Sequence, residues 1–128
     1  MAATPAAMRR QSFLLPLMFF LGSVSAGEAD VIDVTIRAMG NGEFRINATL
    51  QHADTGWEHY ADAWDVLNEY GEVLGTRVLH HPHVEEQPFT RGLSLNIPDT
   101  VMSVTIRAKD SKHEYGGESI TVDVPHPE

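Results

Sequence analysis

A short stretch at residues 80–89, HHPHVEEQPF, holds three of the chain's seven histidines. Pro82 fixes its own φ and biases His81 toward extended geometry, so a helix is not expected there. In an extended segment, residues two apart point the same way, and the imidazoles of His81 and His83 can therefore converge on one point. Two imidazoles on one face are a common way of supplying two ligands to a metal ion. The alternative is a polar, solvated loop whose histidines contact only water.

The elements that would position these histidines are strands. Apolar and polar residues alternate with period two in seven segments, separated by turn residues, and no helical period competes. The predicted strands cover residues 32–38, 43–51, 60–67, 73–79, 93–97, 102–109 and 120–124. The pattern predicts an all-β fold, a seven-stranded antiparallel immunoglobulin/fibronectin-III-like β-sandwich with Trp64 buried between the sheets. A small barrel is the alternative.

Antiparallel succession places alternate connections at opposite ends of such a domain. One end receives the turns at residues 40–42, 68–72 and 98–100, which contain no histidine. The other end receives the loops at 52–59, 80–87 and 111–117. These loops and the adjoining strand ends hold every histidine except His126, namely His52, His59, His80, His81, His83 and His113. We therefore expect one histidine-rich pole.

Strand parity adds three polar side chains to this pole. His52 continues the inward series of the second strand, Asp62 shares the face of Trp64, and Asp110 continues the inward face of the sixth strand. An inward polar group costs free energy unless it is paired. Such groups should therefore hydrogen-bond one another, a histidine or a bound ion.

These residues define a candidate metal site. We expect one divalent transition ion bound by His81 and His83 together with His52 or His113 from a facing loop, and His59 and His80 are further candidate ligands. Imidazole and carboxylate ligands without thiolate suit copper or zinc, and carboxylates commonly orient the imidazole rings. The supporting residues are Asp54, Asp62, Asp110 and Glu85, with Trp57 and Tyr60 as candidates for the floor of a pocket.

The first 26 residues have the pattern of a signal peptide. Arg9 and Arg10 form a basic region, an apolar core follows, and Ser-Val-Ser-Ala fits a cleavage site after Ala26. The apolar run is shorter than a membrane-spanning helix requires, so we expect cleavage without a remaining membrane span, and a periplasmic or secreted protein. The chain has no cysteine, so nothing in this region supports a lipid-anchored route. Residues 27–128 are then one β-sandwich domain.

Charge and motifs narrow the functional classes. After residue 26 the chain has seven basic and 18 acidic residues, a formal charge of −11. Nucleic acids and anionic lipids need cationic surface, so cations or basic partners are favoured. No HExxH, phosphate-binding or GxSxG motif is present, and we predict no catalytic residue. The alternative to metal binding is a non-catalytic protein-interaction or envelope assembly module without a metal.

Three segments, HYADAWDVL, GTRVLHHPHVEEQPFTRGL and VTIRAKDSKHEYGG, together resemble a family of small exported proteobacterial proteins of uncharacterised activity. The resemblance covers nearly all of the chain after residue 26. It implies an exported single domain and no catalytic residue. The sandwich shape also resembles periplasmic copper-carrier domains, in fold class alone, because their methionine-rich copper loop is missing. Met39 and Met102 are the only methionines after residue 26, and both fit ordinary strand positions.

Overall fold

The computed structural model describes residues 27–127, and every regular element within them is a β-strand. The predicted signal peptide lies outside the described residues. The strands are β2 (Asp30–Gly40), β3 (Glu43–Gln51), β4 (Ala61–Leu67), β5 (Val73–Val78), β6 (Phe89–Asn96), β7 (Ser103–Asp110) and β8 (Ile120–Asp123). Each corresponds to one predicted strand.

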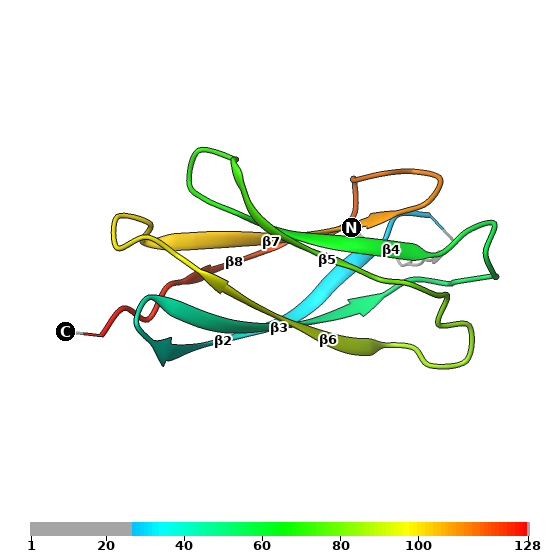
Figure 1. The fold of residues 1–128 in the computed structure, drawn as a ribbon. Coiled ribbons are helices and arrows are strands. Elements are labelled where there is room, and N and C mark those ends of the chain that lie inside the picture. The colour runs from blue at the N-terminus through cyan, green and yellow to red at the C-terminus, as the bar shows by residue number, and fades with distance from the viewer. Residues whose placement is uncertain (1–26, 128) are drawn as a thin grey trace, which may run out of the picture.

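Two antiparallel sheets pack face to face (Figure 1). One has the strand order β2-β3-β6 and the other has the order β5-β4-β7-β8. Every pairing within them is antiparallel. The predicted immunoglobulin/fibronectin-III-like sandwich is therefore confirmed.

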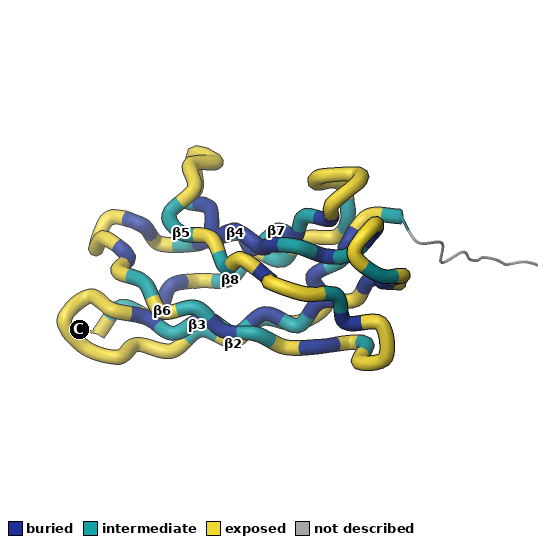
Figure 2. The backbone as a smooth tube through the Cα atoms, turned by 45° about the vertical axis from the view of Figure 1, so that its right-hand side comes forward, coloured by how far each residue is buried: buried dark blue, intermediate teal, exposed yellow. Residues whose placement is uncertain are grey.

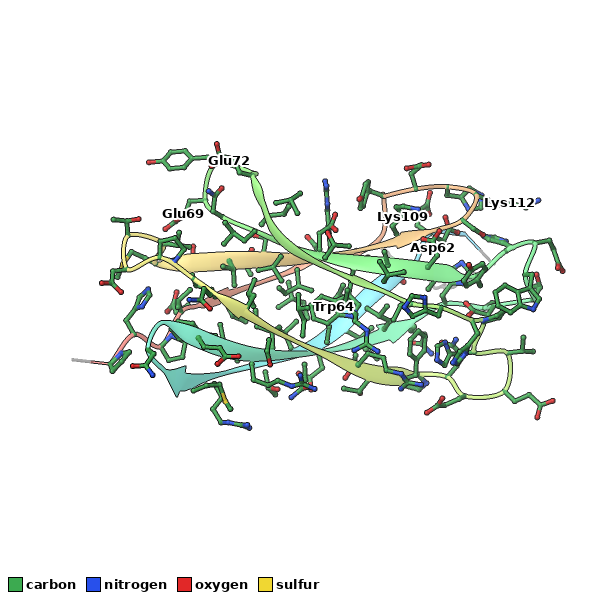
Figure 3. All side chains as sticks on the ribbon, viewed as in Figure 1. Asp62, Trp64, Glu69, Glu72, Lys109 and Lys112 are labelled. Carbon is green, nitrogen blue, oxygen red and sulfur yellow. The ribbon has the colours of Figure 1, made fainter. Side chains whose placement is uncertain are left out.

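The core lies between the two sheets, and buried positions recur along the strands of both (Figure 2). Trp64 of β4 is completely buried and lies between the layers (Figure 3), as predicted. The inward series of β3 is also confirmed, because Phe44, Ile46, Ala48 and Leu50 are all buried. Successive side chains of a paired strand point to opposite faces, which is why the apolar and polar alternation predicted these buried positions.

Strict alternation would place Ile32 and Met102 on the inward faces of their strands, and the structure contradicts both. Ile32 is 45% exposed because the register of β2 shifts between Val31 and Asp33, so Val31 takes the buried position instead. Met102 is 60% exposed because it precedes β7, in a turn where the amide of Val101 donates to Pro98 O and Val101 is buried. A bulge or turn breaks the period of two on which a reading of alternation depends.

The loops separate into two ends of the sandwich (Figure 1). The β2–β3, β4–β5 and β6–β7 connections lie at one end, together with the C-terminal segment. The β3–β4, β5–β6 and β7–β8 loops, which carry six histidines, lie at the other end. We call this end the histidine pole.

Candidate metal centre

The centre begins at His52, the residue after β3, whose buried ring continues the inward face of that strand. Its Nδ1 lies 2.5 Å from Oδ1 of Asp54. The carboxylate of Asp54 also accepts hydrogen bonds from the backbone amides of Ala61, at 3.1 Å, and His83, at 2.7 Å. Asp54 is thus held by the β3–β4 and β5–β6 loops and fixes the ring of His52, leaving Nε2 to face the opposite side.

One carboxylate oxygen receives three imidazoles. Oδ2 of Asp110 lies 3.0 Å from Nε2 of His52, 2.6 Å from Nε2 of His59 and 3.0 Å from Nδ1 of His113. Asp110 is fully buried, and His52 and His59 are also buried. The side chain of His113 is 41% exposed. The three rings therefore run from the interior to the rim of the histidine pole.

Local backbone structure explains why these side chains meet. Asp110 ends β7 on its inward face and pairs with Ala61 at the start of β4. A tight turn returns His59 to the site, because its amide donates to Gly56 O at 3.2 Å and its carbonyl accepts Thr55 N at 3.0 Å. The amide of His113 donates to Oδ1 of Asp110 at 2.5 Å, so this carboxylate also holds the β7–β8 loop.

The ligand atoms are close enough for one ion. One atom from each of His52, His59 and Asp110 lies within 4.8 Å of the others, and all three residues are buried. The ring centroids of His52 and His59 are 4.8 Å apart, and those of His59 and His113 are 4.9 Å apart. This buried cluster could hold a metal ion.

Burial and hydrogen bonding oppose each other in the electrostatics of the centre. Burial favours the neutral form of each group, but hydrogen bonds to Asp54 and Asp110 outweigh it and raise the pKa of His52 above 6.5. For Asp110, burial is again outweighed, by hydrogen bonds from His113, His59 and His52, and its pKa falls to about 2. Both shifts favour an ionised Asp110 carboxylate paired with a protonated His52 ring.

The structure places His81 and His83 beside this cluster rather than on Asp110. Their ring centroids are 4.8 Å apart, and the buried ring of His83 stacks on Phe89 at 3.9 Å. Arg91 donates to Nε2 of His83 at 2.9 Å. Burial and the adjacent charge of Arg91 lower the pKa of His83. Within the described residues, Nδ1 of His83 has no hydrogen-bond partner.

The other predicted residues lie around the pole. His80 and Glu85 are exposed. The predicted inward position of Asp62 is wrong, because a register shift between Ala61 and Ala63 breaks the alternation. Its carboxylate instead pairs with Lys109, both oxygens lying 3.0 Å from Nζ (Figure 3). Trp57 is 66% exposed, and its ring meets Tyr60 edge-on at 5.6 Å.

Sequence reasoning missed two contributors. Oε1 of Gln87 accepts the amide of His52 at 3.0 Å while its Nε2 donates to His83 O at 2.9 Å, which ties two loops of the pole together. The carbonyl oxygen of Gly27 lies 3.0 Å from Nε2 of His52. No pattern of residue types could indicate either contact, because one depends on a loop conformation and the other on the main chain.

The comparisons with known proteins correct the expected resemblance. A protein from the archaeon Halomicrobium mukohataei, described as "Putative lipoprotein", is 40% identical to this chain over 96 residues. The match covers 75% of this chain and 47% of that protein, so the chain spans about half the length of its relative. The expected likeness to a proteobacterial family is therefore wrong. No family model matches the chain.

A solved structure, a superoxide reductase (neelaredoxin) from Ignicoccus hospitalis, overlaps with 76% of this chain and 80% of its own. The TM-score is 0.49 at 10% identity. Residues 27–127 contain no helix long and apolar enough to cross a membrane.

Proposed function

We propose that the protein binds one divalent transition-metal ion, copper or zinc, through His52, His59 and Asp110, with His113 as a further ligand from the rim. The observation that carries this proposal is the meeting of three imidazole nitrogens at one buried carboxylate oxygen. Buried titratable groups with shifted pKa values, gathered at one point, are candidates for a functional site.

The ligand chemistry supports the proposal. Zinc bonds imidazole nitrogen at ~2.0 to 2.1 Å, which places the ligands of a tetrahedral site roughly 3.4 Å apart. The ligand atoms of His52, His59 and Asp110 lie within 4.8 Å of one another, so small side-chain rotations would suffice. Asp54 supplies the carboxylate that commonly orients a metal-bound imidazole through its other nitrogen.

An exported location agrees with this function. The first 26 residues have a signal-peptide pattern, and the Halomicrobium relative is described as a lipoprotein, a class of exported protein. We propose a single exported domain, residues 27–128, in the periplasm or outside the cell. Its formal charge of −11 would favour encounters with cations.

A second candidate function is binding of a protein partner at the histidine pole without a metal. It is favoured by the exposure of the Trp57 indole, since exposed aromatic rings often anchor interfaces. Substituting Trp57 would then weaken partner binding and leave metal affinity unchanged. Under the metal-binding proposal, substituting His59 would weaken metal binding and leave partner binding unchanged.

Calorimetric titration of Zn(II) and Cu(II) into tag-free protein tests the proposal. We expect one tight site in the parent protein, retained in His80→Ala and lost in His59→Ala. His80 is the matched control because it is an exposed histidine of the same pole. A His81→Ala, His83→Ala double variant measures whether that pair adds ligands. Weak binding that is equal in the parent and His59→Ala would leave partner binding as the better function.

A further inference from the structure

The main chain of Gly27 reaches the point where the side chains of the metal centre meet. Its carbonyl oxygen and Oδ2 of Asp110 each lie 3.0 Å from Nε2 of His52. An ion that replaced the proton on this nitrogen would therefore face a backbone oxygen as well as the carboxylate. Carbonyl oxygen is itself a ligand for divalent ions.

The segment that follows Gly27 is held in the fold by contacts of its own, and these contacts fix the position of Gly27. Ala29 is buried in the core, and Asp30 accepts the amide of Glu118 at 2.7 Å. Gly117 lies directly against this segment, since a Cβ built on it would lie 2.1 Å from Ala29 O. The β7–β8 loop thus clamps residues 28–30 beside the metal centre.

Gly27 is also the residue at which the signal-peptide pattern predicts a new amino terminus. We propose that cleavage after Ala26 frees the α-amino group of Gly27, and that this nitrogen and the Gly27 carbonyl oxygen together chelate the ion held by His52, His59 and Asp110. This inference rests on the proposed function.

Cleavage after Ala26 decides whether the Gly27 nitrogen can bind a metal ion. In the precursor, the Gly27 nitrogen is an amide whose lone pair is delocalised into the peptide bond, so it is a poor ligand. After cleavage it is an α-ammonium group, which loses one proton to solvent and then donates the lone pair of the amine to the ion. Amine nitrogen and carbonyl oxygen of one residue close a five-membered ring with the metal. Mixed nitrogen and oxygen ligands of this kind suit Cu(II).

The consequence is that tight metal binding depends on cleavage. The uncleaved chain has the imidazoles and the carboxylate but lacks one chelating nitrogen. The precursor would therefore bind copper less tightly than the processed protein, and the complete site would form only after export.

The test compares two proteins that differ by one natural residue. One begins at Gly27 and the other at Ala26, both released from a fusion partner without added residues, and Cu(II) affinity is measured by competition with a chelator. Losing an outer-shell partner already costs about 10- to 100-fold in metal affinity, so we expect a loss of at least ~10-fold for the extended form. Equal affinities would overturn the inference.

Spectroscopy and a matched variant separate this inference from the proposed function. With ¹⁵N introduced at glycine alone, the electron–nuclear double resonance spectrum of bound Cu(II) should show a strongly coupled ¹⁵N in the protein that begins at Gly27, and the absence of that signal would exclude the amino nitrogen as ligand. Equal, tight affinities that His59→Ala abolishes would refute the role of Gly27 and keep the metal site. Equal, weak affinities that His59→Ala leaves unchanged would refute both.

Discussion

At the residue scale, Asp110 organises the buried histidine cluster by accepting hydrogen bonds from three imidazoles and from the amide of His113. A buried carboxylate is stable only when its charge is matched by donors or by an opposite charge. Hydrogen bonds from the imidazoles match this charge without a metal, and the proposed ion would match it in their place. Protons and metal therefore compete for the same nitrogens.

The shifted pKa values of Asp110 and His52 predict how the stability of the metal-free protein depends on pH. The pKa of Asp110 is lowered from 3.8 to about 2, so its contribution is present above 3.8 and is lost as pH falls toward about 2. The pKa of His52 is raised above 6.5, so its contribution is complete below 6.5 and is lost as pH rises through the raised value. Stability should therefore be greatest between these two ranges.

Urea unfolding in the presence of a chelator, repeated across the pH range, measures this profile. His52→Gln should remove the decline on the alkaline side, and His80→Gln, at an exposed histidine, should leave it in place. An alkaline decline of unchanged size in His52→Gln would show that the imidazolium of His52 is not its cause.

At the element scale, the β7–β8 loop holds both His113 and the segment after Gly27. Its far end is fixed to the outer face of the four-stranded sheet, where the hydroxyl of Tyr115 donates to Oδ2 of Asp65 at 2.7 Å and Arg107 lies 3.7 Å over the tyrosine ring. Displacing this loop should therefore affect stability and the metal centre together.

Gly117→Ala tests this coupling. The added methyl group would lie 2.1 Å from the backbone oxygen of Ala29, which cannot move away as a side chain can. We expect a loss of about 1 to 3 kcal/mol in the free energy of unfolding, as for other overpacked sites, and weaker metal binding. Gly75→Ala is the matched control, because its new methyl group would meet the flexible ends of Leu95 and Leu93. Equal effects of the two variants would contradict the clamp.

Alternation along the strands also explains how much of the centre was predictable. His52 and Asp110 continue regular strands, so parity correctly placed both inside the pole. His81 and His83 are predicted to share one ion with His52 or His113, whereas the irregular loop stacks the ring of His83 on Phe89 and places its Nε2 beside Arg91. Loop geometry depends on tertiary contacts such as that of Asp54 with the amide of His83, which no local pattern encodes.

At the scale of the whole molecule, a chain without cysteine depends on its sandwich core for stability. Trp64 is the largest fully buried side chain of that core. Trp64→Ala should lower the free energy of unfolding by ~3 to 5 kcal/mol, in line with other large aromatic truncations. The matched control is Trp57→Ala, at an exposed tryptophan, which should change it by no more than about 0.5 kcal/mol. Similar losses in both variants, measured by urea unfolding, would be inconsistent with this core.

The most direct measurement of the central claim is anomalous diffraction from crystals of the processed protein grown with Cu(II) or Zn(II). A single strong peak is expected within bonding distance, about 2.0 to 2.2 Å, of nitrogen atoms of His52 and His59 and an oxygen of Asp110. A peak at His81 and His83 alone, or no peak at the buried cluster at saturating metal, would contradict the claim that this cluster binds the ion.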